Sequence, residues 1–400
     1  MALEFLMKFG FKSYNSWDPL KKCLVGSAYT TDFFANYPDS KVADTLCRVN
    51  EETGEDLQQL VDILQGEGVD TYRTPQNRVS SVMDLLENRQ QIPKPYNAPR
   101  DHFFVLGENL IYSKRYHDLA AHIWHPAWEN AEDYIEPHFT DTEFAMPKGV
   151  QSFDGACIMR AGRDLTVDSI SSGGEYLQNT WLPLYNKTYD TNFRAHTIKL
   201  GRHTDGVMNL LRPGLIISAV FVENYDVTYP GWEVFKVKKP RDNPYVMEFI
   251  RMKRARSKSK RGWLAGADVE RHKDYWIHGE EANQTLHDFI DLHFKHGVGH
   301  VFETNFDVNI LSLDQDTIIT SGKNADVEKE LWTKYGIKTI VSPMRHRWFW
   351  DGGIHCATVD LYREGTCEDY WPDRTDAGMV MDESFVLERE KEIQDNNRSL

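Results

Sequence analysis

The sequence contains few cysteines, no long hydrophobic run and no excess of positive charge. Its five cysteines form no CxxC pair, so we expect neither a disulfide framework nor a zinc knuckle, and a reducing compartment fits better. No stretch approaches the roughly 18 apolar residues of a membrane-spanning helix, and the first residues lack a secretory signal pattern. The formal net charge of −15 disfavours nucleic acid and anionic membranes as partners. We therefore expect a cytoplasmic protein that binds neither.

A polar residue opens a short apolar strand at five places, and a tight turn follows soon after each strand. The turns are GEN, AGRD, RPG, DQD and REG, and glycine, asparagine and aspartate in such turns favour hairpins. Successive openers lie about 50 residues apart, with one interval of double length, which indicates an array of equivalent units. In a closed ring the openers would converge on one centre. They are Asp101, Asp154, Asp205, Asp307 and Cys356.

Helical and strand patterns alternate between the hairpins. Apolar residues recur at helical spacing from Leu57 to Leu64, glycines end that segment, and residues 69–73 read as a strand. Residues 326–335 repeat this plan ahead of a strand at 337–341. The repeating unit is therefore predicted to be hairpin, helix and strand. The segment WDPLKKCLVG, at 17–26, is predicted to supply a strand that completes one unit from the far end of the chain.

The double-length interval contains an insertion at about 236–297. Its basic stretch at 251–261 is either a solvated loop or a lid that attracts an anionic group. An amphipathic helix is predicted to end the insertion, because apolar residues again recur at helical spacing. They are Ala282, Leu286, Phe289, Ile290 and Phe294.

Several segments resemble, in the same order, the motifs of the glycine and inosamine-phosphate amidinotransferases of the guanidine-modifying superfamily. They are SYNSWDPLKKCLVGSA, PRDHFFVLGENLIYS, FDGACIMRAGRDL, HTD followed by RPGLIIS, DVNILSLD and GGIHCATVDLYREGT, and they span residues 13 to 370. The last segment is the most specific, because its arrangement around a strand-opening cysteine is rare outside that family. The resemblance implies one α/β domain over residues 1–400, a five-bladed α/β propeller (pentein), with Cys356 as the nucleophile.

The residue types fit guanidinium chemistry. A guanidinium is planar and permanently charged, so transfer of its amidino group needs carboxylates to hold it, a soft nucleophile and a proton donor for the leaving amine. Cys356 is the predicted nucleophile, and His203 is the predicted general acid and then base. Asp101 and Asp154 are predicted to hold the guanidinium nitrogens. Asp205 is predicted to orient His203 or to bind the guanidinium.

Other candidate residues have plainer interpretations. Cys23 and Cys157 are predicted to be small buried residues in apolar strands. Strand alternation predicts that His355 points away from Cys356 and is structural, and the His-x-Asp spacing places His203 and Asp205 on one strand face. The histidines lack the carboxylate pattern of a metal site, so neither a metal nor an organic cofactor is expected.

The sequence departs from the family where substrates are selected. In the glycine amidinotransferases an arginine that holds the donor carboxylate follows the His-x-Asp hairpin, whereas residues 219–223 here contain no arginine. Asp307 stands in place of a small serine, and Arg202 stands in place of a methionine. These two residues are predicted to bind the acceptor, and they suit a zwitterion or a diamine.

The resemblance and the residues together predict an amidinotransferase. It would move the amidino group of L-arginine to glycine or to a larger or cationic amine through a covalent amidino-Cys356, releasing ornithine. One alternative is an arginine or guanidine hydrolase of the same superfamily, in which water resolves the adduct. The other is a non-catalytic protein that binds a guanidino ligand. Small-molecule substrates are the expected partners, and a homodimer is compatible with these features.

Overall fold

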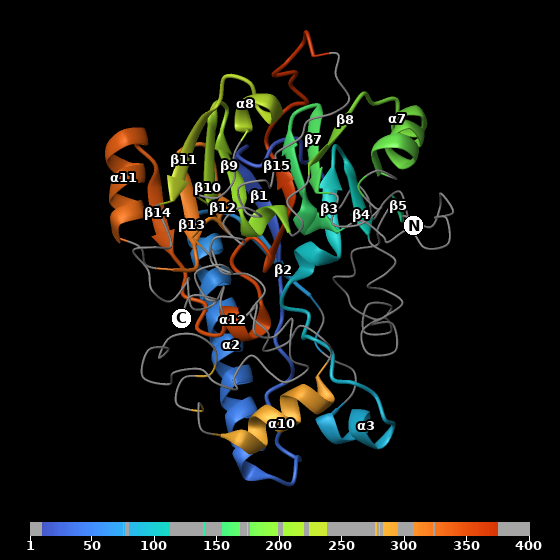
Figure 1. Ribbon diagram of the computed structural model, residues 1–400, viewed down its shortest axis with the longest axis vertical. Coiled ribbons are helices and arrows are strands. Elements are labelled where there is room, and N and C mark those ends of the chain that lie inside the picture. The colour runs from blue at the N-terminus through green and yellow to red at the C-terminus, as the bar shows by residue number, and fades with distance from the viewer. Residues whose placement is uncertain are drawn as a thin grey trace, which may run out of the picture.

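The protein is described here from a computed structural model in which sheets lie in the upper half and helices lie around and below them (Figure 1). The structure describes residues 10–74, 76, 80–112, 139–140, 154–168, 174, 177–198, 203–219, 224–237, 277, 280, 283–294, 307–322 and 325–374.

Five sheets of three strands share one plan, in which an antiparallel pair is extended by a third strand that runs parallel to the middle one. This plan agrees with the repeating unit of hairpin, helix and strand. The sheets are β3 (Phe103–Leu106), β4 (Asn109–Tyr112) and β5 (Phe139–Thr140); β6 (Ile158–Ala161), β7 (Asp164–Asp168) and β8 (Arg194–Ile198); β9 (Met208–Arg212), β10 (Leu215–Ala219) and β11 (Glu233–Val237); β12 (Leu311–Ser312), β13 (Thr317–Thr320) and β14 (Lys338–Val341); and β15 (Thr358–Arg363), β1 (Leu20–Val25) and β2 (Asp70–Arg73).

The fifth sheet joins the two ends of the described chain. β1 pairs antiparallel with β15, with Leu20 opposite Arg363, and parallel with β2. The prediction that residues 17–26 complete a distant unit is therefore confirmed. The predicted hairpin around REG is wrong, because the described residues after Arg363 form no strand and the middle position beside β15 is occupied by β1.

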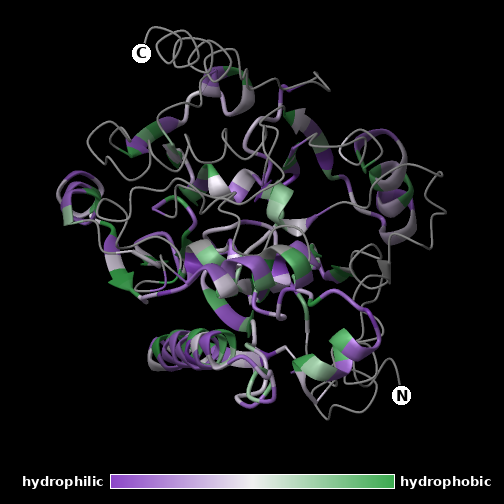
Figure 2. Ribbon diagram, turned by 60° about the horizontal axis from the view of Figure 1, so that its bottom comes forward, coloured by the Kyte–Doolittle hydropathy of each residue, from purple (hydrophilic) through white to green (hydrophobic). Residues whose placement is uncertain are grey.

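The predicted helices are present, and their buried faces explain their positions. α2 (Ser40–Gly66) begins well before Leu57, where the Asp39 side chain accepts from the Lys41 N–H, and it buries Leu57, Leu60 and Leu64. α11 (Ala325–Tyr335) ends before Gly336, which has a φ of +69°. Hydrophobic and hydrophilic residues alternate along the helical ribbons (Figure 2), as expected when one face packs on a core. The remaining helices are α3 (Val82–Glu87), α7 (Leu182–Tyr189), α8 (Tyr225–Thr228), α10 (Gln284–His293) and α12 (Arg347–Trp350), with short turns η1 (Pro99–Asp101), η2 (Gly155–Cys157), η3 (Leu177–Trp181) and η4 (Thr204–Gly206).

The end of the predicted insertion forms α10, which crosses the lower part of α2 (Figure 1). Leu286, Phe289, Ile290 and Phe294 are buried there, as predicted. The basic stretch 251–261 and Ala282 lie outside the described residues. Within the described part of the chain, no helix has the length and apolar character needed to cross a membrane.

Candidate active site

Four of the five predicted openers meet where the short turns before the first strands contact one another. Asp101 ends η1, Asp154 caps η2, Asp205 lies within η4, and Cys356 lies in the turn before β15. η2 contacts both η1 and η4, and β15 contacts η1. The recurrence of the openers at about 50 residues therefore correctly predicted that these four converge.

The Cys356 thiol is buried between an amide and a carboxylate. It is 1% exposed, and its Sγ lies 3.1 Å from Nδ2 of Asn309 and 3.4 Å from Oδ2 of Asp205. Burial, with the Asp205 carboxylate, raises the pKa of Cys356 to about 12, and the hydrogen bond with His203 acts in the opposite direction. The sulfur is thus a protonated thiol at neutral pH before substrate binds.

His203 forms a pair with Asp154. Its Nε2 lies 3.3 Å from Oδ2 of Asp154, whose Oδ1 accepts from the N–H of Ala156 at 2.9 Å. Burial alone would lower the pKa of His203, but the Asp154 carboxylate outweighs it and raises that pKa well above its ordinary value. The imidazolium form therefore persists at neutral pH beside the thiol, as a proton donor requires.

Asp205 pairs with His355, and this corrects two expectations. Oδ2 of Asp205 lies 2.7 Å from Nδ1 of His355. Burial, followed by the positive charge of Arg100, lowers the pKa of His355, so a neutral ring donates to the carboxylate. His355 does not point away from Cys356, because residues 354–357 form a turn and strand alternation does not apply. His203 is held by Asp154 and not by Asp205.

Two carboxylate oxygens in this cluster are buried without a hydrogen-bond partner among the described residues. They are Oδ1 of Asp101 and Oδ1 of Asp205. Burial, together with the nearby Asp154 carboxylate, raises the pKa of Asp101. Unsatisfied acceptors of this kind suit a ligand with several N–H donors and a positive charge, and a guanidinium has both.

The fourth opener faces a different part of the molecule. Asp307 lines a hollow with Ile318, Gly322 and Leu331 between β13, β14 and α11, whereas Asn309 contacts Cys356. The prediction that Asp307 meets the nucleophile is therefore wrong, and Asn309 takes that position. Asn309 stands two residues before β12, as Cys356 stands two residues before β15, and that shared offset is the sequence signal that could have identified it. Arg202 lies outside the described residues.

A buried cluster of arginines behind the site fixes the positions of three openers. Asp360 on β15 accepts from Arg100 at 2.7 Å, from Arg363 at 2.8 Å and from Arg160. Arg100 adjoins Asp101 and its N–H donates to the carbonyl of Cys356 at 3.2 Å, while Arg160 lies on β6 behind Asp154. Asp360 thus joins the elements that carry Cys356, Asp101 and Asp154.

One group among the described residues could hold a metal ion. Asp154, Cys157 and His203 each offer one donor atom, and these atoms lie within 4.8 Å of one another. Cys157 is buried, as predicted, and burial followed by the Asp154 carboxylate raises the pKa of its thiol well above the ordinary value. The thiol is therefore protonated, and the hydrogen-bonded pair of Asp154 and His203 suits proton transfer better than metal binding.

Comparisons with known proteins agree with the motifs. No protein-family model matches the sequence. The chain is 23% identical to the mitochondrial glycine amidinotransferase of Xenopus tropicalis, over 90% of this chain and 84% of that protein. It is also 23% identical to inosamine-phosphate amidinotransferase 1 of Streptomyces glaucescens, over 89% and 98% of the two chains. The resemblance to the amidinotransferases is therefore confirmed over about nine-tenths of the sequence.

Two solved structures share the fold. An amidinotransferase of the saxitoxin biosynthetic pathway from Microseira wollei is 20% identical, with a TM-score of 0.53 over 90% of this chain and 99% of that one. The inosamine-phosphate amidinotransferase of Streptomyces griseus is 19% identical, with a TM-score of 0.54 over the same shares. The α/β fold of this chain is thus one that amidinotransferases adopt.

Proposed function

We propose that this protein is an amidinotransferase that moves the amidino group of L-arginine to an amine through a covalent amidino-Cys356, releasing ornithine. One observation carries the proposal: a buried thiol lies between a histidine–carboxylate pair, His203 and Asp154, and a second carboxylate, Asp205. The relatives that match nine-tenths of the chain are named amidinotransferases, which supports amidino transfer as the class of reaction.

The donor guanidinium would lie among Asp101, Asp154 and Asp205. Their carboxylates can accept from its N–H groups and fix its plane for attack by the sulfur. Its positive charge would also lower the pKa of the Cys356 thiol and favour loss of the thiol proton to water before the attack. The donor would thereby activate its own nucleophile, which explains how a thiol with a pKa of about 12 can react near neutral pH.

In the first step the Cys356 thiolate forms a bond to the guanidinium carbon. The bond from this carbon to the side-chain nitrogen of arginine breaks, and the His203 imidazolium gives its proton to the departing amine. The products are ornithine, a neutral His203 and a positively charged amidino group on the sulfur. Asp205 and its partner His355 stay beside the sulfur and stabilise that charge.

In the second step an acceptor amine attacks the amidino carbon. Neutral His203 takes the proton that the amine loses, the carbon–sulfur bond breaks, and the thiolate and imidazolium are restored. The same histidine therefore acts as acid and then as base. This double role suits His203, whose pKa lies above the ordinary value of a histidine. The acceptor remains to be found by experiment, with glycine and larger or cationic amines as the candidates.

We also infer that the five sheets are the blades of an α/β propeller of one domain. The shared strand plan and the pairing of β1 with β15, which joins the ends of the ring, support this arrangement. The openers of the blades would then face the central axis, where the nucleophile lies. A cytoplasmic location stays a prediction.

The decisive experiment is incubation of the purified protein with L-arginine and a panel of amines. Formation of ornithine together with a guanidino product that depends on the amine is expected. Citrulline formation at the same rate with and without amines would favour the hydrolase. Arginine binding with neither product would favour the non-catalytic alternative.

A further inference from the structure

A positively charged side chain stands beside the nucleophile without a carboxylate partner. The ammonium of Lys94, which is partly buried, donates to the backbone oxygen of Asp351 at 3.1 Å. No carboxylate in the described part of the chain pairs with it. Because an ammonium offers three donors, Lys94 retains hydrogen-bonding capacity for a further acceptor.

This ammonium and Cys356 both lie next to Gly352. A Cβ built on Gly352 would lie 3.3 Å from the Cβ of Cys356, 3.7 Å from Nζ of Lys94 and 4.0 Å from the Cβ of Ala98. The ammonium and the nucleophile thus flank one small surface that a larger side chain would fill. The charge of Lys94 also acts to lower the pKa of Asp101, so the ammonium is within electrostatic reach of one of the carboxylates that would hold the guanidinium.

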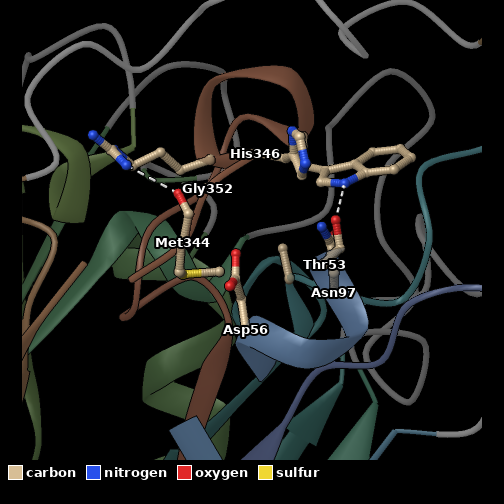
Figure 3. A pocket seen from close by; sticks show the side chains of 9 residues that line it. Thr53, Asp56, Asn97, Met344, His346 and Gly352 are labelled. Carbon is tan, nitrogen blue, oxygen red and sulfur yellow. Dashed lines mark hydrogen bonds between the residues drawn. The ribbon is translucent and has the colours of Figure 1, made fainter. Parts of the chain in front are cut away.

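Gly352 also lines a narrow hollow (Figure 3), whose enclosed space of about 10 Å³ holds about one water molecule, so a larger ligand has to widen it. Ala98 and Asn97 are among the other residues that line it. Asn97 is 5% exposed, and its Oδ1 has no hydrogen-bond partner among the described residues. A buried carbonyl oxygen of this kind is costly unless a ligand donates to it.

We propose that Lys94 and Asn97 form the subsite for the α-amino acid end of the donor, with Lys94 binding its carboxylate and Asn97 accepting from its ammonium. This rests on the proposed amidinotransferase function. The subsite supplies what residues 219–223 lack, because no arginine for the donor carboxylate stands there. The donor would then be an amino acid with a guanidinium side chain, held at both ends with its guanidinium carbon facing Cys356.

The first half-reaction tests this proposal without any acceptor. Native protein and Lys94→Met are incubated with L-arginine, with agmatine, which lacks the carboxylate, and with 5-guanidinopentanoate, which lacks the ammonium. The second-order rate of amidino addition to Cys356 is measured by mass spectrometry. Lys94→Met should lose about 10- to 100-fold on the two carboxylate donors, the range for a hydrogen bond to a charged group, and should change the rate with agmatine far less.

Control variants separate binding from other roles. Lys94→Arg should recover most of the loss. Lys338→Met alters a lysine of the outer strand β14 that pairs with Glu67, and it should change none of the three rates. Asn97→Leu should weaken L-arginine and agmatine, which carry an ammonium, and should spare 5-guanidinopentanoate.

Four outcomes would overturn the assignment. Equal losses on all three donors would show that Lys94 acts on the thiol and not on a carboxylate. A loss confined to the second half-reaction with carboxylate-bearing acceptors would move the subsite from donor to acceptor. If the native protein forms no adduct with any donor, the proposed function and the subsite are both refuted. If Lys94→Met forms the adduct with the same donor preference as the native protein, the subsite alone is refuted.

Discussion

Asn309 holds the nucleophile Cys356 through both ends of its side-chain amide. Its Nδ2 donates to the sulfur at 3.1 Å, and its Oδ1 accepts from the N–H groups of Cys356 at 3.3 Å and of His355 at 2.8 Å. A Cβ on Gly353 would stand 2.6 Å from that Oδ1, so glycine is required for the close approach. The amide therefore sets the position of the thiol relative to Asp205 and His203.

Removing this amide should slow adduct formation while leaving the protein folded. We expect Asn309→Ala to lower the rate of amidino addition to Cys356 by about 10- to 100-fold, because one hydrogen bond to the reacting sulfur and two that order its turn are lost. The measurement is single-turnover kinetics with L-arginine, with thermal unfolding as a check on folding.

Asp307→Ser is the matched control for that variant. Asp307 lies in the hollow beside α11, so its replacement should leave the adduct rate and the order of preferred acceptors unchanged. A shift of preference toward glycine in Asp307→Ser would restore the original expectation that this aspartate faces the acceptor.

Cys356 should be the residue that carries the covalent intermediate. Arginine alone should add one amidino group to the peptide that contains Cys356, and Cys356→Ala should lose both the adduct and turnover. Cys367→Ala, at an exposed cysteine, should keep both. An adduct mapped to Cys157 or to Cys367 would contradict the mechanism.

The raised pKa of Cys356 makes a prediction about pH in the absence of substrate. A thiol with a pKa of about 12 is almost entirely protonated at neutral pH, and the thiolate is the form that reacts. Alkylation of Cys356 by iodoacetamide should therefore be slow at pH 7 and should keep rising with pH through pH 10. A plateau of the labelling rate near pH 8 would show that the thiol is activated before the donor binds.

His203 and Asp154 should have separable effects. His203→Ala removes proton transfer, typically worth about 10² to 10⁴ in rate, and should retain donor binding. Asp154→Asn should weaken donor binding and should also lower the pKa of His203. Because turnover needs the imidazolium, its decline at high pH should lie above the ordinary histidine value of about 6.5 in the native protein and at lower pH in Asp154→Asn. Equal losses of donor affinity in the two variants would contradict this division of roles.

Asp360 should be essential for stability. Three buried arginines hold the pKa of Asp360 well below its ordinary range despite its burial, so its contribution to stability is complete above about pH 4 and is lost as pH falls through the folded-state pKa. Asp360→Asn should cost about 3–5 kcal/mol in the free energy of unfolding, because the arginines lose their counter-charge. Asp316→Asn, at an exposed pair with Arg212, should stay within about 0.5 kcal/mol of the native protein. Urea denaturation measures both variants.

Local patterns in the sequence determined much of this protein. The repeated openers predicted the convergence of Asp101, Asp154, Asp205 and Cys356, and apolar spacing predicted α2, α10 and α11, since side-chain periodicity reflects which face is buried. The strand pattern of residues 17–26 even placed β1 in the sheet of β15. These features depend on residues close together in the chain, or on one plan that recurs in every unit.

The tertiary structure decided which side chains touch. Asp205 meets His355 across 150 positions of sequence and His203 turns to Asp154, because turns precede the strands and break the alternation that strand geometry would impose. Asn309 replaces Asp307 at the sulfur for the same reason: a shift of two residues within a turn redirects a side chain from the site to the face beside α11. Lys94 lies just before the PRD motif and matches none of its positions, and only the folding of its loop against Gly352 brings its charge near Cys356.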